Sequence, residues 1–131
     1  MTGNNYLVDS NIIIEIFSGN KKFADKLNVK KQIFMPAIVL GELYTGINRV
    51  TNKTKHLKTL TDFLKLCNII NIDEATAKIY GELIAALYKK EKPIPTNDVW
   101  IAALSIQHSI TLATKDKHFK EIDGLVFEMW V

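Results

Sequence analysis

Short apolar runs alternate with longer amphipathic segments along this 131-residue chain. The apolar runs are bounded by glycine, proline or polar residues, which is typical of buried strands. They predict strands at 6–8, 33–35, 69–72, 111–113 and 125–131. Apolar residues at helical spacing predict helices at 12–17, 22–27, 36–49 and 75–90, and a helical turn at 117–120. A further helix is predicted to start at Thr51 or Asn52, with Leu57, Leu60, Phe63 and Leu64 on one face. Another is predicted to be capped by Thr96 or Asn97 and to run to about His108.

Strands that alternate with helices predict a mostly parallel sheet covered on both faces. We therefore expect a single α/β domain over residues 1–131, with a three-layer α/β/α architecture. In open sheets of this kind, the site lies beyond the carboxyl ends of the strands. Side chains that follow a strand, or that begin the helix leaving it, are the first candidates for a functional role.

Four acidic residues stand at such positions. Asp9 and Asp116 end or directly follow predicted strands, and Glu42 and Asp98 lie in the first turns of predicted helices. Two carboxylates 4 Å apart repel by about 4 kcal/mol at an effective dielectric near 20. Four together would destabilise a small domain unless a divalent cation lay among them. Hard oxygen ligands favour Mg²⁺ or Mn²⁺ over zinc.

Three of these acids also have ordinary structural explanations. Asp9 is a possible helix cap, although Ser10 and Asn11 are better placed to cap the helix that follows. Asp98 suits the dipole of a first helical turn, and Asp116 suits a turn after a strand. These explanations must all hold at once if there is no site, and we therefore interpret the acids as one cluster.

Glu42 is the most informative acid because it lies in an apolar stretch, one turn after Ile38 and Val39. A carboxylate there is rare unless it is paired or bound to metal. Gly41 and Gly46 lie in the same predicted helix, where each glycine costs about 1 kcal/mol relative to alanine. Two glycines that disfavour the helix, close to one carboxylate, indicate a functional site.

Other polar residues give weaker signals. Asn11 and Thr114 lie two residues from Asp9 and Asp116, and are candidates to hydrogen-bond a carboxylate or a metal-bound water. Capping and turn roles explain both residues about as well. His118 is also near Asp116, but we favour a surface role over a catalytic one.

The charge balance indicates a polyanionic partner. The net charge is +3, and setting the four candidate acids aside leaves 10 of 14 acidic residues against 17 basic ones, a balance of +7. All basic residues except Arg49 are lysine, which favours diffuse attraction to phosphate over bidentate reading of bases. The lysines considered as candidates to follow a phosphate backbone are Lys21, Lys22, Lys53, Lys55, Lys115 and Lys117.

Cysteine content and hydropathy predict a cytoplasmic location. Cys67 is the only cysteine, so no internal disulfide is possible and a reducing compartment is expected. No apolar stretch approaches 18 residues, so we expect no membrane span. The first residues lack the basic and apolar regions of a signal peptide.

The order and spacing of the motifs resemble a PIN domain, most closely the VapC-type toxins of bacterial and archaeal toxin–antitoxin pairs. The residues that carry the resemblance are Val8-Asp9-Ser10-Asn11, Gly41-Glu42-Leu43, Asn97-Asp98-Val99-Trp100-Ile101-Ala102-Ala103 and Thr114-Lys115-Asp116-Lys117-His118-Phe119. The resemblance covers essentially the whole chain. One departure is Glu91-Lys92-Pro93, where many relatives carry a glycine before the proline-containing loop.

This resemblance implies a PIN-like fold and a metal-dependent endoribonuclease, acting as the toxin of a type II pair and inhibiting translation. It also implies a homodimer and a small cognate VapB-type antitoxin. By position, the family's metal-binding acids correspond to Asp9, Glu42, Asp98 and Asp116. Thr114 matches the hydroxyl residue near the metal, and Asn11 the polar residue after the first acid.

Our hypothesis is hydrolysis of RNA assisted by Mg²⁺ or Mn²⁺. Asp9, Asp98 and Asp116 would hold one or two ions, and Glu42 would hold or orient an attacking water.

One alternative is a non-catalytic RNA-binding or regulatory module, whose mark would be loss of the acids. Another is a DNA-directed metal nuclease or metal phosphatase, although this chain has no room for the added segments of nucleases that act on branched DNA. An antitoxin would need to cover an apolar groove and to reach the acidic pocket with a basic side chain. Ile13, Ile14 and Phe17 are candidates to form that groove, although we favour core burial for most of them.

Overall fold

The computed structural model describes residues 5–27 and 32–131. Its strands are β1 (Asn5–Val8), β2 (Gln32–Pro36), β3 (Cys67–Ile70), β4 (Thr111–Thr114) and β5 (Phe127–Met129). Its helices are α1 (Ser10–Phe17), α2 (Lys21–Lys26), α3 (Ala37–Asn48), α4 (Lys53–Leu64), α5 (Glu74–Lys89) and α6 (Thr96–His108), with the 3₁₀ helix η2 (Lys117–Glu121). Each predicted strand and helix is present, and several ends are shifted.

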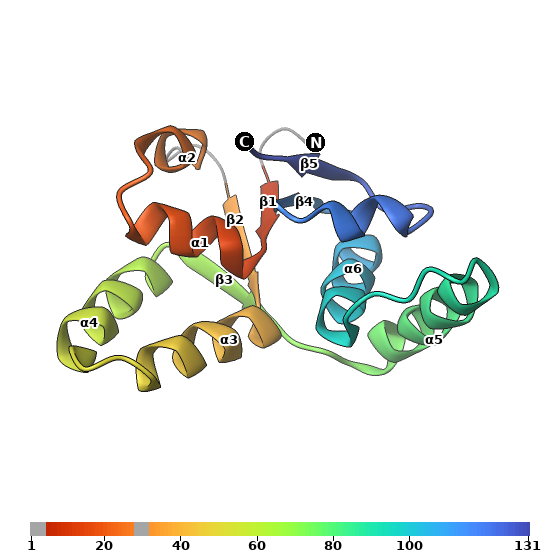
Figure 1. The fold of residues 1–131 in the computed structure, drawn as a ribbon, viewed down its shortest axis with the longest axis horizontal. Helices are drawn as coiled ribbons and strands as arrows, with labels where there is room; N and C mark the ends of the chain where they lie inside the picture. Colours follow the sequence, from red (N-terminus) through yellow and green to blue (C-terminus); the bar gives the residue numbers. More distant parts are fainter. Residues whose placement is uncertain (1–4, 28–31) are drawn as a thin grey trace.

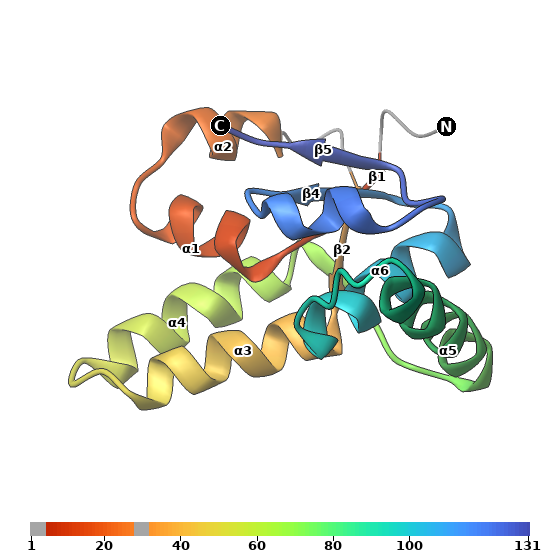
Figure 2. The ribbon, with the colours of Figure 1, turned by 45° about the vertical axis from the view of Figure 1, so that its right-hand side comes forward.

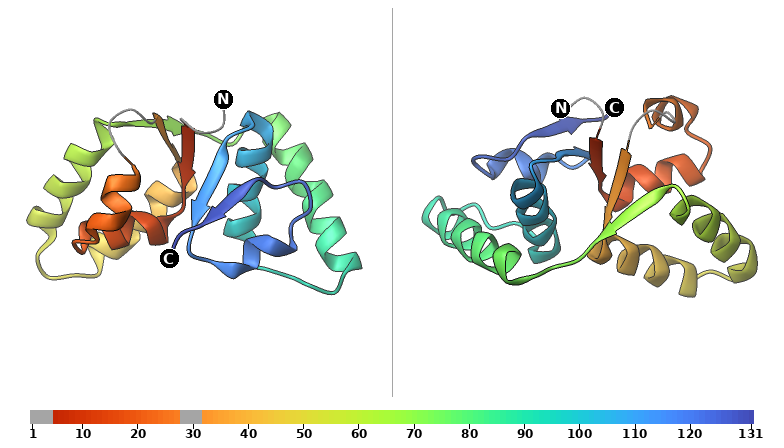
Figure 3. Two further views of the ribbon diagram at one scale, coloured as in Figure 1. Left: turned by 90° about the horizontal axis from the view of Figure 1, so that it is seen from above. Right: turned by 180° about the vertical axis from the view of Figure 1, so that it is seen from behind.

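The strands form one sheet in the order β3-β2-β1-β4-β5, and every neighbouring pair is parallel. In the central strand β1, Leu7 pairs with Phe34 of β2 and with Leu112 of β4. Helices α1 to α4 lie on one side of the sheet, and α5 and α6 lie on the other (Figures 1 and 3). The predicted three-layer α/β/α architecture is therefore confirmed.

The core lies on both faces of the central strands. Leu7, Val8 and Leu112 have no exposed surface, because helices cover the sheet on each side. A strand buried on both faces needs a continuous apolar run, which explains the short unbroken runs in the sequence. Helix α6 contributes the largest buried helical set: Val99, Ile101, Ala102, Ala103, Leu104 and Ser105.

The last residues of the chain pack against α2 and β1. Trp130 is 1% exposed, and its ring meets those of Tyr6 and Phe23 edge-on, with 5.4 Å between ring centroids in each pair. Figure 2 shows the C-terminal segment reaching α2 after β5. These aromatic contacts connect β1 and α2 to the end of the chain.

Two strands differ from their predicted limits. Strand β3 covers Cys67–Ile70, two residues earlier than the predicted 69–72, because its partner β2 ends where Pro36 pairs with Ile70. Ile72 lies beyond the strand and is 40% exposed. Strand β5 is shorter than the predicted 125–131, because β4 offers only Leu112 to Thr114 for pairing.

Helix α5 begins at Glu74, one residue before the predicted start, and Asp73 caps it. Asp73 accepts a hydrogen bond from the Thr76 backbone N–H at 3.1 Å, and the Thr76 hydroxyl accepts one from the Asp73 N–H at 3.0 Å. This reciprocal capping box satisfies two amide groups at the start of the helix.

Within residues 5–27 and 32–131, no helix has both the length and the apolar character needed to cross a membrane.

Candidate metal centre

A cleft opens where the strand order changes direction, between β1 and β4. Loops after these two strands diverge at this point, which makes it the usual ligand site of an open parallel sheet. The cleft has a volume of about 470 Å³. It is lined by Asp9, Ser10, Asn11, Glu42, Pro95, Thr96, Asn97, Asp98 and Asp116. The structure thus brings all four predicted acids into one cleft.

Asp9 leaves the end of β1 and caps helix α1. Its Oδ1 accepts a hydrogen bond from the Ser10 backbone N–H at 2.8 Å, and the residue is only 4% exposed. Helix α1 begins at Ser10 and not at Ile12, because the chain turns directly after β1. The expectation that Ser10 or Asn11 is the better cap was therefore wrong.

Thr114 and Asn11 hold the other oxygen of Asp9. The Thr114 hydroxyl donates to Asp9 Oδ2 at 2.8 Å, and Asn11 Nδ2 donates to the same oxygen at 3.2 Å. Asn11 Oδ1 accepts from the Lys115 N–H at 3.1 Å, and Thr114 Oγ1 accepts from the Asp116 N–H at 3.0 Å. These bonds join the loop after β1 to the loop after β4. Both side chains contact a carboxylate, and their role in function stays a prediction.

Asp98 and Glu42 reach the cleft from helices. Asp98 lies in the first turn of α6, which begins after Pro95. Pro95 is the N-cap and supplies the extended backbone there, so the expectation that Thr96 or Asn97 caps α6 was wrong. Glu42 comes from α3, and its Oε1 is buried with no hydrogen-bond partner in the part of the chain that the structure describes.

Burial and repulsion from neighbouring carboxylates oppose the ionisation of Asp9 and Asp98. Burial, reinforced by the negative charges of Asp98 and Glu42, raises the pKa of Asp9 from 3.8 to about 6, despite the Thr114 hydrogen bond. Burial and the neighbouring Asp116 also raise the pKa of Asp98. A divalent cation would stabilise the charged forms of both and give the buried Glu42 oxygen a partner. The residues present therefore fit a hard cation with oxygen ligands.

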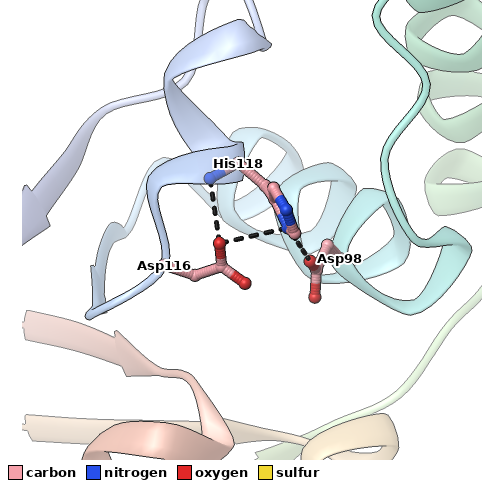
Figure 4. A group of neighbouring side chains, drawn as sticks. All are labelled: Asp98, Asp116 and His118. Atoms are coloured by element: carbon pink, nitrogen blue, oxygen red, sulfur yellow. Dashed lines mark hydrogen bonds and ion pairs between the residues drawn. The ribbon is translucent and has the colours of Figure 1, made fainter.

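His118 also belongs to the cluster, although we expected it at the surface. Asp116 caps η2 by accepting a hydrogen bond from the His118 N–H at 2.9 Å. The imidazole Nδ1 lies 3.1 Å from Asp116 Oδ1 and 3.5 Å from Asp98 Oδ2 (Figure 4). The side chain is 52% exposed, so it does reach the surface, but its ring faces the two carboxylates. Its spacing from Asp116 was the only signal in the sequence.

Comparison with known proteins identifies the family. The PIN domain family model matches residues 6–125. Ribonuclease VapC1 of Rickettsia felis is 35% identical over 123 residues, which is 91% of each chain. Toxin FitB of Neisseria gonorrhoeae is 30% identical over 135 residues, covering 95% of this chain and 97% of FitB. A chain in the crystal structure of VapBC2 from Rickettsia felis, bound to a DNA fragment from their promoter, matches with a TM-score of 0.91 and 30% identity, covering 97% of this chain and 99% of that one.

The parallel sheet and the acidic cleft at its change of strand order are both consistent with this family match. The chain therefore belongs to the PIN domain family. Its relatives within that family include VapC ribonucleases and the toxin FitB, and the resemblance read from the sequence is confirmed.

Proposed function

We propose that this protein is a VapC-type toxin: a metal-dependent endoribonuclease that hydrolyses phosphodiester bonds in RNA and so inhibits translation. The observation that carries the proposal is the gathering of Asp9, Glu42, Asp98 and Asp116 in one cleft, with a buried Glu42 oxygen to which no described residue donates a hydrogen bond. Similarity to proteins named ribonuclease VapC1 and toxin FitB supports the substrate class and the toxin role.

Asp9, Asp98 and Asp116 are the residues that would hold one or two Mg²⁺ or Mn²⁺ ions. When bound, such an ion lowers the pKa of water and offsets the negative charge that grows on the phosphate. Glu42 enters the same cleft from a different helix, and its free Oε1 is a candidate to accept a hydrogen bond from the attacking water. Thr114 and Asn11 fix the orientation of Asp9 through their bonds to Oδ2.

Cleavage of total RNA by the purified chain tests the proposal. We expect discrete fragments in Mg²⁺ or Mn²⁺ and none in EDTA, and mapping the fragment ends gives the target. Intact RNA in both ions, with tight RNA binding and no co-purified antitoxin, would favour the non-catalytic module. Cleavage of a DNA flap in preference to RNA would favour the DNA-directed nuclease.

An apolar groove beside the cleft is our candidate site for a VapB-type antitoxin. It has a volume of about 400 Å³ and is lined by Ile14, Phe17, Ser18, Glu42, Leu43, Gly46, Ile47, Val50, Lys55, His56 and Thr59. Glu42 lines both the groove and the acidic cleft. An antitoxin segment that fills the groove could therefore bring a basic side chain to Glu42 and cover the cleft. Ile13, a third candidate for the groove, is buried in the core, which is the position that we favoured for most of these residues.

Replacing Ile14 with lysine should weaken antitoxin binding without unfolding the chain, because Ile14 is 54% exposed and lines the groove. We expect the Kd for the cognate antitoxin to rise by at least about tenfold, or about 1.4 kcal/mol. Calorimetric titration measures this change. Val126→Lys is the matched control, since Val126 is 60% exposed and lies outside the groove. Equal affinity of the two variants would contradict the assignment.

We also propose that the protein is a cytoplasmic homodimer, on the strength of the family resemblance. Exposed apolar side chains near the edge strand β3, namely Leu66, Ile69 and Ile72, support an additional contact surface. Burial raises the pKa of the Cys67 thiol to about 11, so this thiol is poorly ionised and unreactive near neutral pH. Light scattering of the purified chain tests the dimer, and the mass of a single chain would contradict it.

A further inference from the structure

The ring of His118 lies against two carboxylates of the acid cluster, and two local features of the fold place it there. The Asp116 side chain first caps the 3₁₀ helix η2 through the His118 N–H. The tight turn then folds the imidazole back, so that Nδ1 faces Asp116 Oδ1 at 3.1 Å and Asp98 Oδ2 at 3.5 Å. Figure 4 shows the ring approaching both carboxylates, which come from different elements.

We propose that His118 is a nitrogen ligand of the divalent ion, together with Asp98 and Asp116, and that it makes the site prefer Mn²⁺ over Mg²⁺. This inference rests on the proposed metal-dependent function. One donor atom from each of the three residues lies within 4.8 Å of the other two. Donors about 2.1 Å from a shared ion are separated by about 3 Å when adjacent and about 4.2 Å when opposite. The observed separations therefore require only a small closure.

Burial explains which member of the set can move. Asp98 is held in a helix and is 13% exposed, whereas the His118 side chain is 52% exposed on a short turn. The imidazole can therefore adjust to an ion whose position the carboxylates define. A lone ion pair on the surface would contribute little, about 0 to 1 kcal/mol, so a simple salt bridge gives little reason for the ring to stay in this geometry.

The chemistry of the donor predicts the preference. Mg²⁺ takes oxygen ligands and releases water reluctantly, whereas an imidazole nitrogen is a better ligand for first-row transition ions. A site made only of carboxylates would separate Mn²⁺ from Mg²⁺ less strongly. Replacing His118 by glutamine keeps a polar side chain of similar reach and removes the aromatic nitrogen, so the variant should lose most of the preference.

Two measurements on the full, untagged chain test this proposal. Pulsed electron paramagnetic resonance of bound Mn²⁺ should show ¹⁴N coupling from a coordinated imidazole in the parent, and this coupling should be lost in His118→Gln. Calorimetric titration should show the Mn²⁺-to-Mg²⁺ affinity ratio falling by roughly tenfold in His118→Gln. His108→Gln is the matched control, because His108 is exposed at the end of α6, outside the cleft, and it should keep both signals.

The outcomes separate this inference from the proposed function. Mn²⁺ binding without ¹⁴N coupling, or an affinity ratio unchanged in His118→Gln, would overturn the role of His118 and leave the acidic metal site intact. A parent chain that binds neither ion would overturn the metal-dependent function, and the role of His118 with it. Loss of ¹⁴N coupling in His108→Gln would also overturn the proposal, because it would assign the ligand to a different histidine.

Discussion

Asp9 serves the fold and the site through different oxygens. Oδ1 caps α1 by accepting from Ser10, whereas Oδ2 is held inside the cleft by Thr114 and Asn11. The sequence presents capping and metal binding as alternatives for this residue. They are compatible because a carboxylate has two oxygens, and the turn directly after β1 orients them toward different partners.

Replacing Asp9 with asparagine should stabilise the metal-free protein at neutral pH. The pKa of Asp9 is raised from 3.8 to about 6, so the folded chain holds this proton more tightly than the unfolded chain does. The resulting stability is present below about pH 4 and is lost as the pH rises from about 4 to about 6. The shift corresponds to at most about 3 kcal/mol. The single carbonyl oxygen of asparagine can keep the cap by accepting from the Ser10 N–H, but its NH2 group then replaces Oδ2 opposite Thr114 and Asn11 and offsets part of this gain.

Urea unfolding of the metal-free protein near pH 4 and above pH 7 measures this effect. The advantage of Asp9→Asn over the parent should be larger at the higher pH. Asp25→Asn, an exposed change on α2, is the control and should show no such pH dependence. An Asp9→Asn chain that is less stable than the parent at both pH values would contradict the prediction.

The four acids were predictable from the sequence because each stands at a strand end or helix start, and a parallel sheet brings such positions to one edge. Contacts within the cluster were not predictable. The free Glu42 oxygen and the approach of His118 to Asp98 depend on side-chain torsions and on a 3₁₀ turn. Residue spacing fixes neither of these.

At the scale of elements, α3 keeps glycines where alanine would be more stable. A Cβ at Gly41 or Gly46 would meet no atom within 4 Å, so packing in the described chain does not require either glycine. Gly46 lines the groove assigned to the antitoxin. A partner that packs closely on α3 would explain a missing side chain there, whereas the acidic cleft gives no such reason.

Gly41→Ala should therefore stabilise the protein by about 0.5 to 1 kcal/mol, because alanine loses less backbone entropy in a helix. Thermal or urea unfolding measures the change. Gly124→Ala is the contrasting variant: Gly124 has a φ of +84°, a left-handed conformation that alanine adopts only with strain, so this change should destabilise. Effects of the same sign for the two substitutions would contradict this reasoning.

Element order and type were predictable from hydrophobic periodicity, whereas some limits were not. The β-branched residues Ile69, Ile70 and Ile72 extend the predicted strand to Ile72, but β3 stops at Ile70, because Pro36 is the last residue of its partner strand. The start of α6 was also displaced, since Pro95 provides the N-cap backbone without a capping side chain. Both limits depend on a neighbouring element or on backbone geometry that a local pattern does not contain.

At the scale of the whole molecule, basic residues outnumber the acidic residues that lie outside the cleft. Once the four cleft acids are set aside, 10 acidic residues remain against 17 basic ones. Some of this charge is internally paired, as for Lys115, whose Nζ lies 2.7 Å from Glu15 Oε2. The remaining excess attracts phosphate, and a divalent ion in the cleft would add to that attraction.

RNA binding should accordingly weaken as salt rises. Raising monovalent salt from about 50 to about 200 mM should reduce the affinity for a short single-stranded RNA roughly twentyfold, as expected if about three phosphates are neutralised. Fluorescence anisotropy with Asp98→Asn measures binding without cleavage. Glu128→Gln, which removes an acid outside the cleft lining, should keep the same salt slope. An affinity independent of salt would contradict a phosphate-based interaction.

The central claim is tested most directly by the rate of cleavage of one defined RNA in Mn²⁺. This rate is compared between the parent, Asp98→Asn and Asp25→Asn. Asp98 lies in the cleft, and burial together with Asp116 already disfavours its charged form, so asparagine should preserve the fold. We predict a rate at least about 100-fold lower for Asp98→Asn, an unchanged circular dichroism spectrum, and parental activity for Asp25→Asn. If Asp98→Asn cleaves as fast as the parent, the acid cleft is not the nuclease centre.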